Sequence, residues 1–352
     1  MLFFNRRRKK RISSSIATRR KKATQPRSRQ GQWLPSKAIP VLTVIGLLLG
    51  GLVYWDKAWD ILSVIKQVIE EAAGSSNNNG GNRNDDNDND NDSPNPTNSP
   101  PLPLKLYSWN IANFGESKNS KEIEFIAAQI KEADLVAIQE VSVMGAGAAA
   151  VARLADELNR KGNHWDYVLS QPTTGAGSER YAFLWKTAKM SLVGNVWNVE
   201  VQGLADKIDR EPCLAKFRTN GRQFVIANFH ALPVTKNPAQ EIPHIEALHN
   251  VYQKENLIIA GDFNLSEKNK AFDGLKSKKY SPVLKNQRTS LRKTIEPNGN
   301  YLSQEYDNIF IENAPFVVLR SGINDFVPQV KTLARANEIS DHLPIWCELQ
   351  MH

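Results

Sequence analysis

Short apolar runs alternate with amphipathic stretches from Leu104 to the end of the chain. The apolar runs have the length of buried β-strands and cover 104–110, 135–139, 165–169, 181–185, 214–217, 224–230, 257–260, 308–311 and 344–349. Apolar residues recur at helical spacing over 120–132, 148–161 and 238–252. Asn237 and Pro238 suit the start of the third helix. Many strands with fewer helices predict a layered α/β sandwich rather than a helical bundle.

The front of the chain follows a different pattern. Residues 38–55 carry no charge, and as a helix they would reach about 27 Å, close to the ~30 Å hydrocarbon core of a bilayer. Trp33, Tyr54 and Trp55 stand where interfacial aromatic residues are found. We expect a transmembrane helix that contacts the lipid bilayer over 38–55. A cleavable signal peptide and a buried core helix are the alternatives, and no small-x-small cleavage pattern follows this run.

The distribution of charge predicts the orientation of this helix. Residues 1–37 contain 13 Lys and Arg and no acidic residue. Dense positive charge before a transmembrane helix remains cytoplasmic, so we expect a basic cytoplasmic tail over 1–37 and an extracytoplasmic domain at 104–352. The alternative is a nucleic-acid-binding tail. Residues 104–352 contain 29 basic and 28 acidic residues, so the net charge of +8 does not by itself make that domain a nucleic-acid binder.

Two further segments separate the expected membrane helix from the strand-rich part. Residues 56–73 repeat apolar side chains at helical spacing and predict an amphipathic stalk helix, which could also serve self-association. Residues 74–103 consist mainly of Asn, Asp, Ser, Gly and Pro, and they predict a disordered linker because they have too little apolar surface to offset ordering entropy. Calcium binding by the Asp run is the alternative. The two cysteines, Cys213 and Cys347, lie in apolar strands and are expected to be buried free thiols, or a disulfide if the domain is exported.

Polar residues stand at the ends of several of the predicted strands. They are Asn110, Glu140, His230, Asp262, Asn264, Asp307, Asp341 and His342. A charged group at the end of a buried strand is costly unless a partner, a metal or a catalytic task accompanies it. Carboxylate and amide oxygens suit Mg²⁺ best here, with Mn²⁺ or Ca²⁺ as alternatives. We expect His164, His244 and His249 to be surface or structural residues.

Several short motifs together resemble the endonuclease/exonuclease/phosphatase superfamily, and within it the deoxyribonuclease I-like endonucleases. They are Trp109-Asn110-Ile111, Gln139-Glu140-Val141, Glu179-Arg180-Tyr181-Ala182-Phe183-Leu184, Arg210-Glu211-Pro212, His230-Ala231-Leu232-Pro233, Gly261-Asp262-Phe263-Asn264 and Ser340-Asp341-His342-Leu343-Pro344. The resemblance covers about residues 104–350. It implies a four-layer sandwich of two packed β-sheets flanked by helices, and metal-dependent hydrolysis of phosphodiesters.

The resemblance also implies roles for individual residues. Oxygen ligands from Asn110, Glu140 and Asp341 would hold the divalent cation. Asp262 and Asn264 would orient the phosphate and the attacking water.

Two histidine–carboxylate pairs would transfer protons. His342, held by Asp307, would be the general base, and His230, paired with Glu179, would be the general acid. Such pairs suit chemistry near neutral pH.

The expected substrate is DNA, cut with little sequence preference. Arg180 and Arg210 would lie at the DNA-facing surface, and the basic stretch 268–293 is typical of a segment that follows a phosphate backbone. Ala112 and Ser142 stand where secreted nucleases of this group often carry arginine, which weakens the case for tight double-strand binding. The alternatives are a lipid or inositol phosphodiesterase and a non-catalytic tethered binding module. The sequence indicates no protein partner.

Overall fold

The computed structural model describes residues 103–115, 117–199 and 207–352. The predicted tail, membrane helix and stalk, and all but the last residue of the predicted linker, lie outside the described residues. Within the described ranges, no helix has the length and apolar character needed to span a bilayer.

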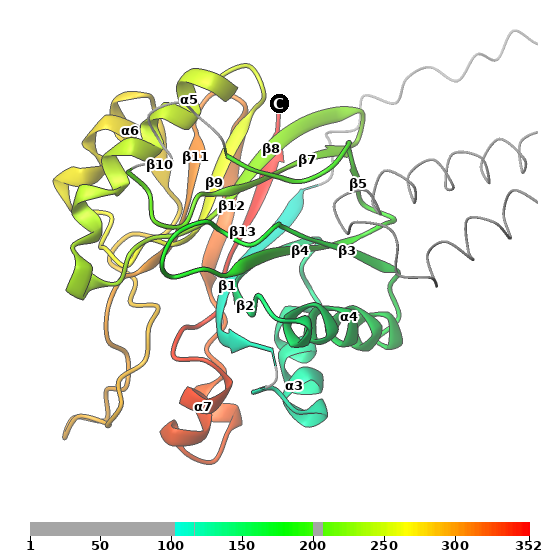
Figure 1. Ribbon diagram of the computed structural model, residues 1–352, viewed down its shortest axis with the longest axis vertical. Coiled ribbons are helices and arrows are strands. Elements are labelled where there is room, and N and C mark those ends of the chain that lie inside the picture. Colours follow the sequence, from blue (N-terminus) through cyan, green and yellow to red (C-terminus); the bar gives the residue numbers. More distant parts are fainter. Residues whose placement is uncertain (1–102, 116, 200–206) are drawn as a thin grey trace, which may run out of the picture. The chain divides into compact units, whose positions relative to one another are not determined.

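Two mixed β-sheets form the centre of the described domain (Figure 1). In spatial order, the first sheet consists of β12 (Phe316–Ile323), β13 (Ile345–Met351), β1 (Leu104–Phe114), β2 (Leu135–Val141), β4 (Arg180–Lys186) and β3 (Trp165–Leu169). The second consists of β10 (Tyr280–Pro282), β11 (Asp307–Glu312), β9 (Leu257–Asp262), β8 (Arg222–His230), β7 (Cys213–Thr219) and β5 (Ser191–Leu192), with β6 (Trp197–Asn198) also paired to β7. Strands β1 and β2 are parallel, as are β8 and β9, and the other pairs are antiparallel.

Helices cover the outer faces of both sheets. Helices α3 (Ser120–Ile130) and α4 (Gly145–Arg160) share one apolar core with the first sheet, and α5 (Glu246–Tyr252) and α6 (Asp273–Ser277) share another with the second. A third core, rich in Phe and Leu, lies between the sheets. Helix α7 (Leu333–Ile339) packs near β1. The layered sandwich predicted from the sequence is therefore confirmed for the described domain.

Helix α3 shows how local sequence sets these elements. The Asn119 side chain accepts hydrogen bonds from the Lys121 and Glu122 N–H groups, and the Glu122 carboxylate accepts one from the Asn119 N–H at 2.8 Å. This capping box satisfies N–H groups that have no partner inside the helix. Ile123 and Ile126 then face the core from the same side of the helix.

The prediction of a continuous helix over 238–252 is wrong for its first half. Residues Pro238–Gln240 and Ile242–Ile245 form short 3₁₀ turns, and only Glu246–Tyr252 is α-helical. Asn237 has a φ of 59° and its side chain caps nothing. Pro243, inside the stretch, has no N–H to give to an α-helical hydrogen bond, so a continuous helix is disfavoured there.

Candidate active site

Most of the predicted polar residues gather at one end of the two sheets. Asn110 and Glu140 come from the carboxyl ends of the parallel strands β1 and β2. His230 and Asp262 are paired at the carboxyl ends of β8 and β9, and Asp307 at the start of β11 is paired with Asp262. Parallel strands bring their carboxyl ends to one edge, so the topology assembles these side chains from both sheets.

A buried polar layer joins the two sheets directly beneath this end. The Gln139 amide donates to Asn228 Oδ1 at 2.6 Å and to Ser108 Oγ at 3.1 Å, and the Asn228 amide donates to the Ile138 carbonyl at 3.0 Å. Gln139 precedes Glu140, and Asn228 lies two residues before His230. The layer therefore fixes the site residues of the first sheet, such as Glu140, relative to those of the second sheet, such as His230.

His230 is held by a network of charged groups. Its Nδ1 lies 2.9 Å from Glu179 Oε2. The Arg210 guanidinium donates to the same Glu179 oxygen at 3.1 Å, to the His230 carbonyl at 3.0 Å, and to the Ala231 carbonyl. Glu179 Oε1 also accepts a hydrogen bond from the Glu140 N–H at 3.1 Å. The imidazole orientation is thus fixed by its partner carboxylate and by the arginine behind that carboxylate.

His342 forms the second histidine–carboxylate pair. Its Nδ1 lies 2.8 Å from Asp307 Oδ2, and the Thr289 hydroxyl donates to that same oxygen at 2.6 Å. Thr289 Oγ1 in turn accepts from the Asp307 N–H at 3.0 Å. The His342 N–H donates to Ser340 Oγ, whose hydroxyl donates to the Asn110 carbonyl. The motif Ser340-Asp341-His342 is therefore attached to β1.

Asp262 stands between the two histidines. Its Oδ2 lies 3.4 Å from His230 Nε2 and 3.5 Å from His342 Nε2. Gly261 makes this position possible, because its φ is 151° and a Cβ there would lie 1.8 Å from the Phe229 carbonyl oxygen. The outer nitrogens of both imidazoles thus face one carboxylate from opposite sides.

Asn110 and Glu140 form a separate corner of the site. The Asn110 amide donates to Glu140 Oε1 and to Asp262 Oδ2, both at 3.0 Å. Glu140 has a φ of 59°, a costly backbone conformation for this residue, and it sits where the ladder of β2 is interrupted. Because of this irregularity, the half-buried Glu140 side chain does not follow the regular alternation of side chains between the two faces of the sheet, and its carboxylate lies beside Asn110.

This corner fits a hard divalent cation. Asn110 Oδ1 is buried and has no hydrogen-bond partner among the described residues, although it is an acceptor. An amide oxygen beside a carboxylate is the donor set that Mg²⁺ or Ca²⁺ takes. The third expected ligand, Asp341, is partly exposed, and its carboxylate lies 3.8 Å from Lys293 Nζ.

A second group could also hold a cation. One ligand atom each from Asp262, Asp307 and His342 lies within 4.8 Å of the others. The hydrogen bond between His342 and Asp307 accounts for much of this proximity without an ion. The structure therefore offers two places with ligands for a cation, this group and the Asn110–Glu140 corner.

The two predicted substrate arginines both make hydrogen bonds within the domain. Arg210 is only 8 % exposed, and its guanidinium is directed inward as described above. The Arg180 guanidinium donates to the Ser170 carbonyl at 2.8 Å. Asn264 does join the site, because its amide donates to Asp262 Oδ2 at 3.4 Å and to the Ala231 carbonyl at 3.2 Å.

The charges around the two histidines stabilise their protonated forms. Burial alone would lower the pKa of His230, but the charge and hydrogen bond of Glu179, helped by Asp262, raise it above its ordinary value. Burial opposes protonation of His342 too, yet Asp307 and Asp262 raise its pKa well above the ordinary value. The two imidazolium charges outweigh the effect of burial on Asp262 and lower its pKa. The surroundings therefore favour the protonated form of both histidines, and His342 must lose a proton before it can act as a base.

Two supporting residues have no signature in the sequence. Thr289 belongs to a loop with no recognisable motif, yet it binds Asp307. Glu241 is 1 % exposed, and its carboxylate accepts from the Asp209 N–H and the Leu232 N–H, both at 2.7 Å. It joins the segment that carries Arg210 to the segment that follows His230. Only the spatial arrangement reveals either role.

The basic stretch 268–293 is partly neutralised. Ion pairs join Lys268 to Glu305, Lys278 to Glu246, Arg292 to Glu296 and Lys293 to Asp341. Lys285 and Arg288 are exposed. The stretch is therefore less available to a phosphate backbone than its composition indicates, and Lys285 and Arg288 remain its accessible part.

The remaining candidate residues lie outside the site. Cys213 and Cys347 are buried and free, as expected. His164 is exposed, His244 is half-buried, and His249 packs edge-on against Tyr280.

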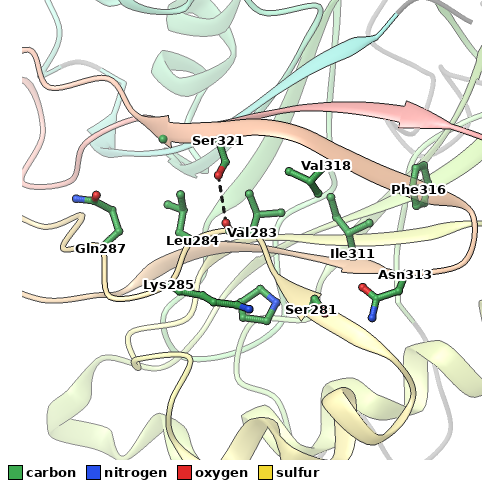
Figure 2. Close-up of a pocket in the computed structure, with 12 residues that line it drawn as sticks. Ser281, Val283, Leu284, Lys285, Gln287, Ile311, Asn313, Phe316, Val318 and Ser321 are labelled. Atoms are coloured by element: carbon green, nitrogen blue, oxygen red, sulfur yellow. Dashed lines mark hydrogen bonds between the residues drawn. The ribbon is translucent and has the colours of Figure 1, made fainter.

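A cavity of about 600 Å³ opens between β12 and the strands β10 and β11 (Figure 2). Its walls combine apolar side chains such as Leu284, Ile311 and Phe316 with polar groups such as Lys285. The Ser321 hydroxyl closes one part by donating to the Val283 carbonyl at 3.2 Å. None of the predicted catalytic or metal residues lines this cavity.

Comparison with known proteins identifies the family. The profile of the Endonuclease/Exonuclease/phosphatase family matches residues 107–342. Deoxyribonuclease gamma of Rattus norvegicus is 28 % identical over 284 residues, which cover 71 % of this chain and 85 % of the relative. A deoxyribonuclease of Thioalkalivibrio sp. (strain K90mix) is 28 % identical over 270 residues, covering 69 % and 70 %. The crystal structure of an endonuclease/exonuclease/phosphatase from Bacteroides vulgatus superposes with a TM-score of 0.53 at 16 % identity, covering 71 % of this chain and 99 % of that one.

The matched region spans the whole catalytic end of both sheets. The chain belongs to the Endonuclease/Exonuclease/phosphatase family, and it is a phosphodiester hydrolase.

Proposed function

We propose that this protein is a divalent-metal-dependent endonuclease that hydrolyses DNA with little sequence preference and is tethered to a membrane. The observation that carries the proposal is the pair of histidine–carboxylate couples, His230–Glu179 and His342–Asp307, on either side of Asp262. Hydrolysis of a phosphodiester needs a base for the attacking water and an acid for the departing oxygen. Relatives named as deoxyribonucleases support DNA as the substrate.

Each group has a defined task in this proposal. His342 Nε2, once neutral, accepts a proton from the water whose oxygen forms the new bond to phosphorus. The bond between phosphorus and the leaving oxygen breaks, and His230 Nε2 donates its proton to that oxygen. Asp262 and Asn264 orient the phosphate and the water between the two imidazoles, which Asp307 and Glu179 hold in place.

Asn110, Glu140 and Asp341 are the residues that would hold the metal, with Mg²⁺ as the expected ion. When bound, a divalent cation offsets the negative charge of the phosphate and of the surrounding carboxylates. The proposed requirement is tested by adding EDTA to a plasmid-nicking assay and then restoring Mg²⁺, Mn²⁺ or Ca²⁺ singly. Activity that persists at full rate in EDTA would contradict it.

The proton-transfer roles are tested by His230→Ala and His342→Ala in the full-length chain. Each change is expected to reduce the rate of plasmid nicking by about 10²–10⁴-fold, the usual contribution of a positioned acid or base. His249→Ala, a matched histidine change in α5, should leave the rate unchanged. Unaltered nicking by either active-site variant would refute the assigned roles.

A comparison of two substrates separates the alternatives. A lipid or inositol phosphodiesterase would hydrolyse phospholipid substrates and leave plasmid intact, and a non-catalytic module would act on neither. The wild-type chain is therefore assayed on both substrates with Mg²⁺. Plasmid cleavage without lipid turnover is the expected result.

The tether is proposed from the sequence. A transmembrane helix at 38–55, preceded by the basic tail, would leave the N-terminus in the cytoplasm and the catalytic domain outside it. The linker at 74–103 would join the two.

A further inference from the structure

A buried lysine contacts the segment that leads to the proposed base. Lys118 lies between β1 and α3, and only 3 % of its surface is exposed. Lysine is almost never buried to this degree unless its ammonium group has partners. The Lys118 ammonium donates to the Glu338 carbonyl oxygen at 2.9 Å. Lys118 is therefore joined to the last turn of α7, four residues before His342.

The Glu338 carbonyl is one of the groups that a helix leaves without a partner at its end. In a continuing α-helix it would accept from the N–H group four residues later, which is that of His342. That N–H donates instead to Ser340 Oγ at 2.9 Å. The chain leaves the helix at Ser340, whose backbone is extended with a φ of −164° and a ψ of 147°. The Lys118 ammonium thus takes the place of the His342 N–H at the end of α7.

The exit from α7 is held at two successive points. Lys118 holds it at Glu338, and the Ser340 hydroxyl holds it to β1 by donating to the Asn110 carbonyl at 2.6 Å. His342 follows directly, and its N–H depends on the position of Ser340 Oγ. The placement of the imidazole therefore depends on where α7 ends.

The main chain of Lys118 is itself fixed. Its carbonyl accepts from the Arg153 guanidinium of α4 at 3.0 Å, and its N–H donates to the Gly115 carbonyl at 3.2 Å. The next residue, Asn119, caps α3. Figure 1 shows α7 on the same side of the domain as α3 and α4. The lysine thus ties the end of α7 to the helices that cover the first sheet.

The charges around Lys118 favour its ammonium form. Burial lowers the pKa of Lys118, and Arg335 acts in the same direction, whereas the carboxylates of Glu122, Glu140 and Asp341 oppose this effect. A cation also suits the negative end of a helix dipole. The contact with α7 therefore combines a hydrogen bond with electrostatic attraction.

We infer that Lys118 is a positioning residue for the proposed base, and that its ammonium group fixes the end of α7 so that His342 faces Asp262. The inference rests on the proposed function, because it concerns how His342 is placed for proton transfer. Without Lys118, the Glu338 carbonyl loses this partner, and the exit from α7 is held to the first sheet by Ser340 alone.

The test uses the full-length chain and the variant Lys118→Met, which keeps the length of the side chain and removes the donor. We expect kcat for plasmid nicking to fall by about 10–100-fold, the loss that misplacement of a catalytic group causes, while KM stays unchanged. The rate on bis(p-nitrophenyl) phosphate should fall by the same factor, because the base acts on both substrates. Lys118→Arg keeps a charged donor and should retain most of the wild-type kcat.

A matched lysine supplies the control. Lys186, at the far end of β4, lies 3.6 Å from Asp134 through its ammonium group, and Lys186→Met should leave kcat and KM unchanged. Thermal melting shows which variants are folded. If Lys118→Met does not fold, Lys118→Gln gives the same test, because its side chain is one atom too short for the contact.

A second measurement follows the backbone without catalysis. In EDTA, hydrogen exchange at the amides of 340–343 should be faster in Lys118→Met than in the wild-type chain, whereas β8 and β9 should keep their protection. The inference is overturned if the folded variant keeps the wild-type kcat on both substrates, if Lys118→Arg loses as much kcat as Lys118→Met, or if exchange at 340–343 is unchanged. A wild-type chain that hydrolyses the small ester and leaves DNA intact would contradict the proposed function, and the ester would still test Lys118.

Discussion

At the residue scale, the surroundings of His230 determine how the site should respond to pH. Glu179 and Asp262 raise the pKa of this imidazole, while Arg210 and burial oppose them. A general acid works only in its protonated form. The contribution of this acid should therefore be complete below the raised pKa of His230 and be lost as the pH rises through it, which gives the rate profile an alkaline limb.

Glu179→Gln tests this account. The change removes the charge that raises the pKa of His230 and keeps a side chain of the same shape. The pKa of His230 should fall, so the alkaline limb of the kcat/KM profile for plasmid nicking should move to lower pH. The loss relative to wild type should be larger at pH 8 than at pH 6.

A matched carboxylate supplies the control. Glu255 is ion-paired with Lys216 at 2.7 Å, outside the site, and Glu255→Gln should leave the pH profile in place. An alkaline limb that stays at the wild-type pH in Glu179→Gln would mean that His230 is not the general acid.

At the element scale, the segment Asp209–Arg210–Glu211 joins neighbouring loops through hydrogen bonds. Asp209 accepts from the Ala176 and Gly177 N–H groups, and Glu211 accepts from the Thr174 N–H at 3.0 Å. Arg210, between them, holds Glu179 and the backbone of His230. Three consecutive charged residues thus fix the loop that leads into β4 against the end of β8.

Arg210→Gln distinguishes this positioning role from phosphate binding. We expect kcat on DNA to fall by about 10–100-fold through misplacement of the acid, a loss of the order that poor positioning causes. KM and the salt dependence of DNA binding in EDTA should not change. Loss of a phosphate contact would instead reduce the slope of log K against log [salt] by about 0.9, and that result would restore the role predicted from the sequence.

Three further measurements support this comparison. Arg218→Gln, a change at an exposed arginine of β7, should leave kcat, KM and the salt slope unaltered. Thermal melting of Arg210→Gln shows that the kinetics are measured on folded protein. Partial recovery of kcat on addition of guanidinium ion would support positioning directly.

The same elements show what the sequence could and could not predict. The nine predicted strands are present because their apolar runs are buried, and their terminal polar residues mark the site. Strand β12 was missed because it is an edge strand with Val317, Val318 and Leu319 all partly exposed, so it lacks a clear alternation. The contact between Arg210 and Glu179 could not be predicted, because the two residues are 31 positions apart in the sequence and meet only in the folded domain.

The supporting residues were beyond prediction for a related reason. Thr289 and Glu241 act through hydrogen bonds to groups that only the folded chain brings near. Their local sequence resembles that of any loop. Candidate catalytic residues at strand ends can therefore be recognised in the sequence. The residues that orient them can be recognised only in the folded structure.

At the scale of the whole molecule, the catalytic end lies opposite the point where the chain enters the domain. Leu104 is paired with Leu349 at one end of the first sheet, and Asn110 lies six residues further along β1 at the other end. At ~3.3 Å per residue this separates the two by about 20 Å. The site and the first described strand residue, Leu104, thus lie at opposite ends of β1.

This arrangement gives the topology proposal a direct test. Protease added to intact cells that make the full-length chain should cut within 74–103, where the composition predicts a disordered linker, and release a fragment that still nicks plasmid. The basic tail at 1–37 should stay protected until the membrane is permeabilised, as should a cytoplasmic marker protein. A catalytic domain that resists protease in intact cells and is digested only after permeabilisation would place it in the cytoplasm. That result would reverse the orientation derived from the 13 basic residues of the tail and leave the chemistry of the site unaffected.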